Sequence, residues 1–316
     1  MSRLKLHFDF GWHSTRSDAA GLDGRLRTFR PFVLVSEDTT LSREKRLAQI
    51  LGTNLCIDAA RKGKPGERAL IEEVYSGSGG FQQYTNELLL RNRAILFFLE
   101  DHGKEREVDD LEKRIIRLES IGIKKILGML SEESISVLRQ LLDACMEMCS
   151  IREPNILENL GTLESDLARL YPRFRDMKEI KVFVRYGLAH RTIYDKACEA
   201  GMEATCWYDP MEEPTGFLIL RMLNLNPNVA VPDEFILRMT IENAIEAALV
   251  KKLQKTRREL SSGLGYTLAK QYMEGKPTDE LLRIFEAGRT LETSEAIQVL
   301  AMRDDLRQLW EQATIL

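Results

Sequence analysis

Short apolar runs alternate with longer stretches of helical period through the first two thirds of the chain. Four of these runs are flanked by turn residues and are short enough to be strands, at residues 31–36, 94–99, 180–185 and 204–207. Such alternation is typical of βα units, in which a parallel sheet is covered by helices. The pattern therefore predicts an α/β protein in which these four strands are neighbours in one mostly parallel sheet.

The remaining segments carry the period of amphipathic helices. Residues 104–178 predict a helical insertion, and from Asp233 onward the pattern predicts only helices. We therefore expect an α/β sheet domain over 1–215 and a helical C-terminal region over 216–316. The stripes in IENAIEAALVKKL and AIQVLAMRDDLRQLW need a partner. This predicts packing on the sheet domain or on a second copy, giving a homodimer through the C-terminal helices.

Composition excludes several classes of protein. No run approaches the ~18 to 20 apolar residues that cross a bilayer, and the N-terminus lacks the apolar centre of a signal peptide, so we expect a cytoplasmic protein with no membrane partner. The net charge of −4 is spread over both signs, which argues against nucleic acid as a partner. Five cysteines are an odd number for a disulfide framework, and no further ligand pair near Cys145 and Cys149 completes a zinc site.

Polar side chains gather where three predicted strands end. The first strand is followed by Glu37, the second by Glu100, Asp101 and His102, and the third ends in Arg185, with His190 shortly after it. The carboxyl ends of parallel strands meet at one edge of a sheet, where ligands bind. The sequence therefore predicts a site at this edge.

The same segments resemble the Tiki, TraB and erythromycin esterase-like superfamily. KVFVRYGLAHRTIYDKACEAGMEATCWYD is similar to its closing βαβ unit, with a GxxH turn from Gly187 to His190, and SIREPNILENL is similar to its helix carrying an Arg and an Asn, here Arg152 and Asn155. PFVLVSEDTTLSREKRLAQIL and AILFFLEDHG resemble its opening and second strands. The chain departs from the pattern at Thr39, which stands where the family has a histidine. The resemblance covers roughly residues 30–210.

This resemblance implies a hydrolase that acts on a peptide, ester or lactone bond of a small-molecule or peptide substrate. The catalytic candidates are Glu37, Glu100 and His190, with His190 as a general base toward water. The same three residues are the candidate ligands of a divalent metal such as Mn or Co. The candidate substrate-binding residues, where Arg152 would hold an anionic group or an oxyanion, are Arg152, Asn155, Arg185 and Asp101.

Other readings stay open. The protein could be a non-catalytic ligand- or partner-binding protein that kept the fold, with His190 capping a helix, Glu37 and Glu100 solvated, and His102 exposed in a loop. The spacing of Arg185 and His190 also matches a HEPN ribonuclease motif, which belongs inside a helix. Here the β-branched and aromatic run before Gly187 argues against it.

Overall fold

A computed structural model gives the fold of the chain. It describes residues 3–11, 21–37, 43–62, 94–127, 131–209, 213–254, 262–284, 295, 302–306 and 308. Among these residues, five strands form one sheet in the order β3-β2-β4-β1-β5, and every strand pair is parallel. The strands are β1 (Leu4–Gly11), β2 (Val33–Ser36), β3 (Ile95–Phe97), β4 (Ile180–Gly187) and β5 (Ala204–Trp207). The predicted α/β fold with a parallel sheet is confirmed.

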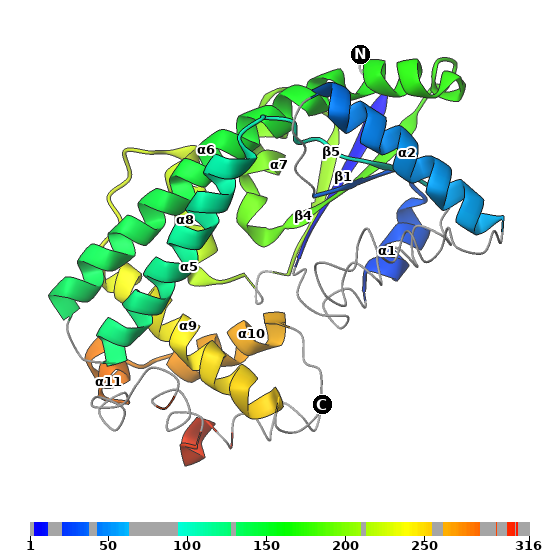
Figure 1. Cartoon of the computed structure of the whole chain (residues 1–316). Helices are drawn as coiled ribbons and strands as arrows, with labels where there is room; N and C mark the ends of the chain where they lie inside the picture. The colour runs from blue at the N-terminus through cyan, green and yellow to red at the C-terminus, as the bar shows by residue number, and fades with distance from the viewer. Residues whose placement is uncertain are drawn as a thin grey trace. The chain divides into compact units, whose positions relative to one another are not determined.

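The N-terminal strand β1 was not among the four predicted strands, yet it is central. It pairs with β4 along its whole length, from Leu4 opposite Ile180 to Gly11 opposite Gly187, and with β5 on its other side. Figure 1 shows it in blue among the green strands. The four predicted strands do lie in one sheet, but β4 and β5 are not neighbours, because β1 separates them.

The alternation of side chains along β1 gives the sheet two different faces. Successive residues of a strand point to opposite faces, so the apolar Phe8 and Phe10 share one face, while His7 and Asp9 share the other. The apolar face meets α7 (Thr192–Glu199), where the Tyr194 ring contacts Phe8 edge-on. The polar face is covered by α1 (Leu22–Phe29), as the contacts of Arg25 and Phe29 described below show.

Helix α2 (Arg43–Arg61) covers the free edge of β3. The Asn54 amide donates to the Leu96 carbonyl at 2.7 Å, and its oxygen accepts from the Leu96 N–H at 2.8 Å. Arg61 donates to the Ala94 carbonyl. An exposed strand edge is a template for aggregation, and here two side chains of α2 satisfy its backbone groups instead.

The chain divides into two compact units. Unit 1 contains residues 1–108 and 149–208, and unit 2 contains residues 109–148 and 209–316. Part of the predicted helical insertion thus belongs to the same unit as the C-terminal helices. The helices not yet introduced are α5 (Glu105–Leu127), α6 (Ser131–Leu170), α8 (Thr215–Leu225), α9 (Asp233–Gln254), α10 (Ser262–Met273) and α11 (Thr278–Arg283), with the short 3₁₀ turns η2 (Pro172–Phe174) and η3 (Leu188–His190).

Helix α9 is the core of unit 2. It packs against α8, α10 and α11, and Thr240 lies close to Gly122 of α5. Its buried residues occur on most sides of the helix, including Ile236, Ile241, Ile245 and Leu249, as expected for a helix enclosed by others. Its apolar side chains therefore find partners within unit 2.

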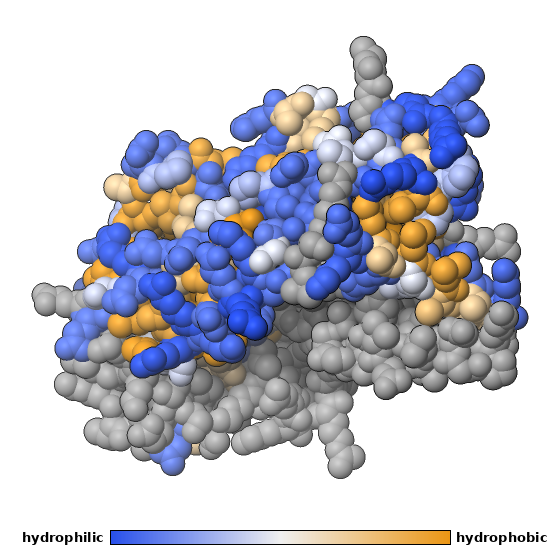
Figure 2. Space-filling view, turned by 45° about the horizontal axis from the view of Figure 1, so that its top comes forward, coloured by the Kyte–Doolittle hydropathy of each residue, from blue (hydrophilic) through white to orange (hydrophobic). Residues whose placement is uncertain are grey.

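The coloured part of the face seen in Figure 2 is largely hydrophilic, with separate apolar patches. The exposed apolar side chains include Leu218, Met222 and Leu225, which follow one another at helical spacing along α8. A homodimer through the C-terminal region stays a prediction. No helix among the described residues is both long enough and apolar enough to cross a membrane.

Candidate functional site

Two carboxylates follow neighbouring strands at the carboxyl edge of the sheet in unit 1. Glu37 comes directly after β2, and Glu100 lies three residues beyond the end of β3. Since β2 and β3 are adjacent and parallel, their carboxyl ends lie together. Glu100 is fully buried, whereas the side chain of Glu37 is 24% exposed. The pair therefore reaches the surface at Glu37.

The guanidinium of Arg152, on α6, lies between these carboxylates. Its Nε donates to Glu100 Oε2 at 2.7 Å, and its Nη2 donates to Glu100 Oε1 at 2.8 Å and to Glu37 Oε1 at 2.6 Å. Burial alone would lower the pKa of Arg152, but the hydrogen bonds and charges of the two glutamates raise it well above its usual range. Arg152 therefore stays charged and holds both glutamates in fixed positions.

His190 joins the cluster from the turn after β4. It ends η3, and its Nε2 lies 3.4 Å from Glu37 Oε1. The other oxygen of Glu37 accepts from the Gly187 backbone N–H at 3.0 Å. The Nδ1 atom of His190 is buried and makes no hydrogen bond within the described part of the chain. One imidazole nitrogen thus lies near Glu37, while the other is buried without a hydrogen-bond partner among the described residues.

A second imidazole lies at the opposite end of the cluster. The side chain of His102 is only 4% exposed, and its Nε2 lies 3.8 Å from Glu100 Oε2, which is too long for a hydrogen bond. Its Nδ1 accepts from the Lys104 backbone N–H. The expectation that His102 is an exposed loop residue is therefore wrong. In the sequence, His102 directly follows the carboxylates Glu100 and Asp101, and this position indicated that it belongs to the site.

Asp101 and Asn155, both expected to bind substrate, bond to each other. The Asn155 amide donates to Asp101 Oδ1 at 2.8 Å and accepts from the Asp101 N–H at 2.7 Å. Asn159 donates to the same oxygen, and Arg46 of α2 forms an ion pair with Asp101 Oδ2 at 2.9 Å. These contacts fix the turn that follows Glu100, and a substrate-binding role of Asp101 and Asn155 stays a prediction.

The residues of α6 that build this network form one polar stripe. Arg152, Asn155, Asn159 and Asp166 are separated by three, four and seven positions, spacings that place side chains on one helix face. Arg46 donates to Asn159 and to Asp166 and is itself fully buried. Sequence reasoning found the first two members of the stripe. The helical spacing could also have found the other two.

Arg185 lies on the polar face of the sheet. It forms an ion pair with Asp9, the residue opposite it on β1, and Asp9 also pairs with Arg25 of α1. Sequence reasoning missed Asp9 and Arg25 because β1 was not recognised as a strand. Arg185 lies in β4 and His190 in η3, so the two residues of the HEPN-like spacing do not share a helix.

Tyr186 is a further residue that sequence reasoning missed. It is fully buried, its ring meets His190 edge-on at 5.8 Å between centroids, and its hydroxyl makes no hydrogen bond within the described residues. Burial, followed by the charges of Glu100 and Glu37, raises its pKa well above the usual range. Tyr186 is therefore a neutral O–H donor beside the cluster.

The cluster does not fit the metal site that the resemblance implies. No group of three His, Cys, Asp or Glu side chains in the described ranges is placed to hold a metal ion. The Arg152 guanidinium lies between Glu37 and Glu100, where a metal ion shared by the two carboxylates would have to bind. Thr39, which stands at the family's histidine position, lies outside the described residues.

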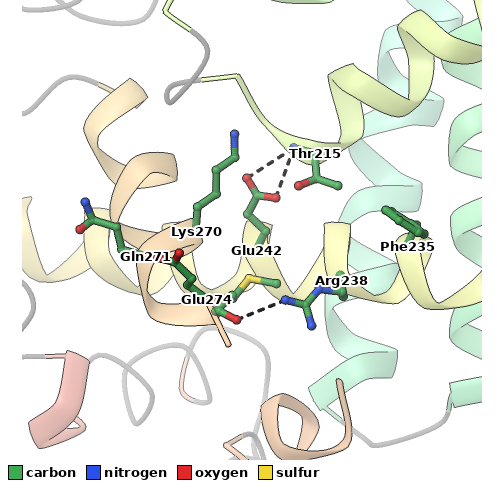
Figure 3. A pocket seen from close by; sticks show the side chains of 8 residues that line it. Thr215, Phe235, Arg238, Glu242, Lys270, Gln271 and Glu274 are labelled. Carbon is green, nitrogen blue, oxygen red and sulfur yellow. Dashed lines mark hydrogen bonds between the residues drawn. The ribbon is translucent and has the colours of Figure 1, made fainter. Parts of the chain in front are cut away.

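Unit 2 contains a separate hollow of about 360 Å³ with charged side chains in its lining (Figure 3). Three of the charged side chains in its lining bond to backbone groups. Arg238 donates to the Met273 and Lys276 carbonyls, and Glu242 accepts from the Thr215 N–H. Lys270 donates to the Glu213 carbonyl. These bonds join α8, α9 and α10, which identifies the hollow as a packing junction.

No family model, no curated protein and no solved structure matches the chain. The fold and the cluster together define an α/β protein with a parallel sheet that carries two carboxylates, an arginine and two imidazoles at its carboxyl edge.

Proposed function

We propose that the chain is a hydrolase whose active site is the cluster of Glu37, Glu100, Arg152 and His190. The observation that carries the proposal is the orientation of the Glu37–His190 pair. Glu37 is held by the Arg152 guanidinium and by the Gly187 N–H, so the oxygen that faces His190 Nε2 has a fixed position. A base that is oriented by an anchored carboxylate is a recurring device of hydrolytic sites.

In this arrangement His190 acts as the general base. With its Nε2–H directed at Glu37, its Nδ1 accepts a proton from water as the water oxygen attacks the carbonyl carbon. Glu37 stabilises the resulting imidazolium. When the tetrahedral intermediate collapses, the bond to the leaving group breaks, and His190 returns the proton to that group.

Arg152 supplies the complementary charge for the oxyanion. Its contacts to the glutamates use Nε and Nη2, while Nη1 makes no hydrogen bond within the described part of the chain. An N–H donor aimed at the developing oxyanion stabilises the transition state more than the ground state. We assign this role to Arg152 Nη1 and assign the positioning of Arg152 to Glu100.

The substrate class rests on the resemblance to the Tiki, TraB and erythromycin esterase-like superfamily, and we propose a peptide, ester or lactone bond. Support comes from the convergence of Glu37, Glu100, Arg152 and His190, four residues that the motifs selected from distant parts of the chain. No step of the proposed mechanism passes through a metal ion.

A second candidate is a non-catalytic binding protein that kept the fold. The observation that favours it is the pairing of Glu100, whose two oxygens both accept from Arg152 in a buried ion pair. Buried ion pairs of this kind also serve purely structural roles. In that case the cluster would hold α6 against the sheet, and substitution of His190 would change no reaction.

The test is a hydrolysis screen of the full chain with p-nitrophenyl esters, lactones and short peptides, in the presence of Mn²⁺, Co²⁺ or a chelator. His190→Ala and Glu37→Gln should each lower kcat by about 100- to 10,000-fold, the usual contribution of a general base. Glu107→Gln, on the exposed surface of α5, is the matched control and should keep full activity.

The outcomes separate the candidates. Loss in both site variants, with an unchanged unfolding midpoint and no effect of chelator, supports the proposed mechanism. Loss in chelator would replace the metal-free route by a metal-assisted one. Equal activity of His190→Ala and the parent chain, or inactivity across the screen, would contradict the hydrolase and favour the binding protein.

A further inference from the structure

Unit 1 contains a second hollow, on the polar face of the sheet, that the proposed hydrolase does not use. It has a volume of about 440 Å³ and lies between α1 and the side chains of β1, β4 and β5. This volume is within the range of small-molecule sites. Its lining includes Lys5, His7, Lys181 and Trp207 from the strands.

Lysine side chains mark the start of the hollow. Lys5 and Lys181 are directly opposite each other on the adjacent strands β1 and β4, so both side chains project from the same face. The described contact of Lys181 is the face of the Phe29 ring at 5.9 Å, and no carboxylate of the described residues pairs with it. Lys5 pairs with Glu179 at 3.8 Å, where both side chains are about half exposed. Such a pair contributes little, so an anion could bind both lysines.

Aromatic rings mark the other end of the hollow. Trp207 ends β5, the edge strand of the sheet, and is 37% exposed. The Arg25 guanidinium lies 3.5 Å from the Trp207 ring centroid and pairs with Asp9, which it shares with Arg185. Asp9 is the register partner of Trp207. Lys5 and Asp9 are four residue steps apart along β1, about 13 Å. A small ligand can span this distance from the lysines to the aromatic end.

The middle of the hollow offers hydrogen bonding without charge. The rings of Phe29 and Phe183 lie 5.2 and 5.1 Å from His7, whose Nδ1 contacts Thr205 Oγ1 at 2.8 Å. The pKa of His7 is lowered, and burial is the largest cause. The charge of Asp9 opposes this shift, and the charge of Arg25 adds to it. His7 is therefore neutral at pH 7 and does not add to the charge of the lysines.

Gly24 keeps the helix side of the hollow open. It lines the hollow from α1, and a Cβ placed on it would meet no atom of the described residues within 4 Å. Glycine inside a helix costs about 1 kcal/mol relative to alanine. Gly24 is exposed and leaves open space on the helix side of the hollow.

We propose that this hollow binds a small anion joined to a flat ring, such as an aryl or nucleoside monophosphate or an aromatic carboxylate. Lys5 and Lys181 hold the anionic group, and the ring lies along the aromatic side chains toward Trp207. The proposal is independent of the hydrolase, because it uses none of the residues of the Glu37 cluster.

The full chain is titrated with phenyl phosphate, AMP and benzoate, and with inorganic phosphate and adenosine as the separate halves of the ligand. Binding is measured by calorimetry and by tryptophan fluorescence. Phenyl phosphate or AMP should bind at least about tenfold more tightly than either half, since each end of the hollow contributes. Benzoate shows whether a carboxylate replaces the phosphate. Trp207→Phe should remove the fluorescence change.

Matched variants locate the site. Lys181→Met keeps the apolar stem and removes the charge, and should weaken binding about tenfold. Gly24→Leu fills the hollow and should abolish binding. Gly24→Ala should raise the melting temperature and weaken binding less, which separates obstruction from misfolding. Lys104→Met, an exposed lysine at the carboxyl edge of the sheet, is the control and should bind as the parent chain does.

Three results would overturn the proposal. If inorganic phosphate binds as tightly as phenyl phosphate, the ring contributes nothing, and the lysines act only as a positively charged surface. Unchanged binding in both Lys181→Met and Gly24→Leu would place the ligand elsewhere. Absence of binding by every probe at about 5 mM, weaker than any specific site of this size requires, would exclude a ligand of this class.

Discussion

Two pairs of glutamates that are wholly or partly buried, one in each unit, differ in the charged groups beside them. In unit 1 the guanidinium of Arg152 lies between Glu37 and Glu100 and bonds to both. In unit 2, Glu246 of α9 lies near Glu119 of α5, and burial first and Glu119 second raise the pKa of Glu246 to about 7. Burial also raises the pKa of Glu119.

The difference teaches how a protein can keep buried carboxylates in either of two states. A cation between the carboxylates keeps them charged and directional, because its hydrogen bonds replace the lost water. Without that cation, burial favours the protonated form. The effect extends to the neighbours of the unit 2 pair, since burial and then Glu119 raise the pKa of the Cys145 thiol to about 12. In unit 1 the Arg152 guanidinium stays charged beside the glutamates, whereas in unit 2 burial shifts Glu119 and Glu246 toward the protonated form.

The largest effect is expected from Arg152→Ala. The change leaves Glu37 and the fully buried Glu100 without their common partner, which should cost about 3 to 5 kcal/mol of unfolding free energy. Urea unfolding at pH 7 measures this. Arg152→Ala combined with Glu100→Gln should recover part of the loss, and a double variant no more stable than the single one would contradict the assignment.

Glu246→Gln should have the opposite sign. Below pH ~4.5 the carboxyl is protonated in both states, and the native state loses stability as the pH rises through the folded pKa of about 7, because ionisation is costly there. The variant avoids this loss, so above pH 7 it should be more stable than the parent by up to about 3 kcal/mol. Melting temperatures at pH 5 and pH 8 measure the difference, and a variant that is less stable at pH 8 would refute it.

Glu119→Gln tests the coupling inside unit 2. Removing the second cause of the shift should lower the pKa of Glu246 by about one pH unit or less, while burial, the first cause, keeps it above 4.5. Carboxyl-carbon NMR titration of Glu246 measures this directly. A pKa that does not move would mean that Glu119 is screened from Glu246.

The smallest effect is expected at an ion pair on the surface of unit 2. Arg114 and Glu147 lie 3.4 Å apart, and each side chain is about half exposed. Arg114→Ala should cost no more than about 1 kcal/mol, because water solvates both charges. The same urea experiment as for Arg152→Ala measures it, and a cost as large as that of Arg152→Ala would show that burial is not what separates the two pairs.

The sequence predicted the strands that consist of short, mostly apolar runs. The run 94–99 is apolar throughout because it lies in the core. The sequence also predicted the helix that begins at Asp233, which is α9. Residues 4–11 were harder to assign, because a strand at the centre of a parallel sheet is usually apolar throughout. Here Asp9 interrupts the run, and it is tolerated because Arg25 and Arg185 pair with it.

The sequence also predicted which residues meet at the carboxyl edge, but it did not predict their pairing. Glu37, Glu100 and His190 follow from the rule that the ends of parallel strands coincide. The insertion of Arg152 between the carboxylates depends on how α6 lies against the sheet, and so does the bonding of Asp101 to Asn155. A local pattern contains no information about that placement.

The alternation of apolar runs and helical periods by itself determined the α/β class, the parallel sheet and the edge where polar groups gather, because these follow from local periodicity and from connection rules. Only the tertiary structure decided that β1 is central, that Arg152 rather than a metal lies between Glu37 and Glu100, and that Lys5 meets Lys181 across β1 and β4. These contacts join residues far apart in the chain, and their energies depend on burial and distance, which exist only once the chain has folded.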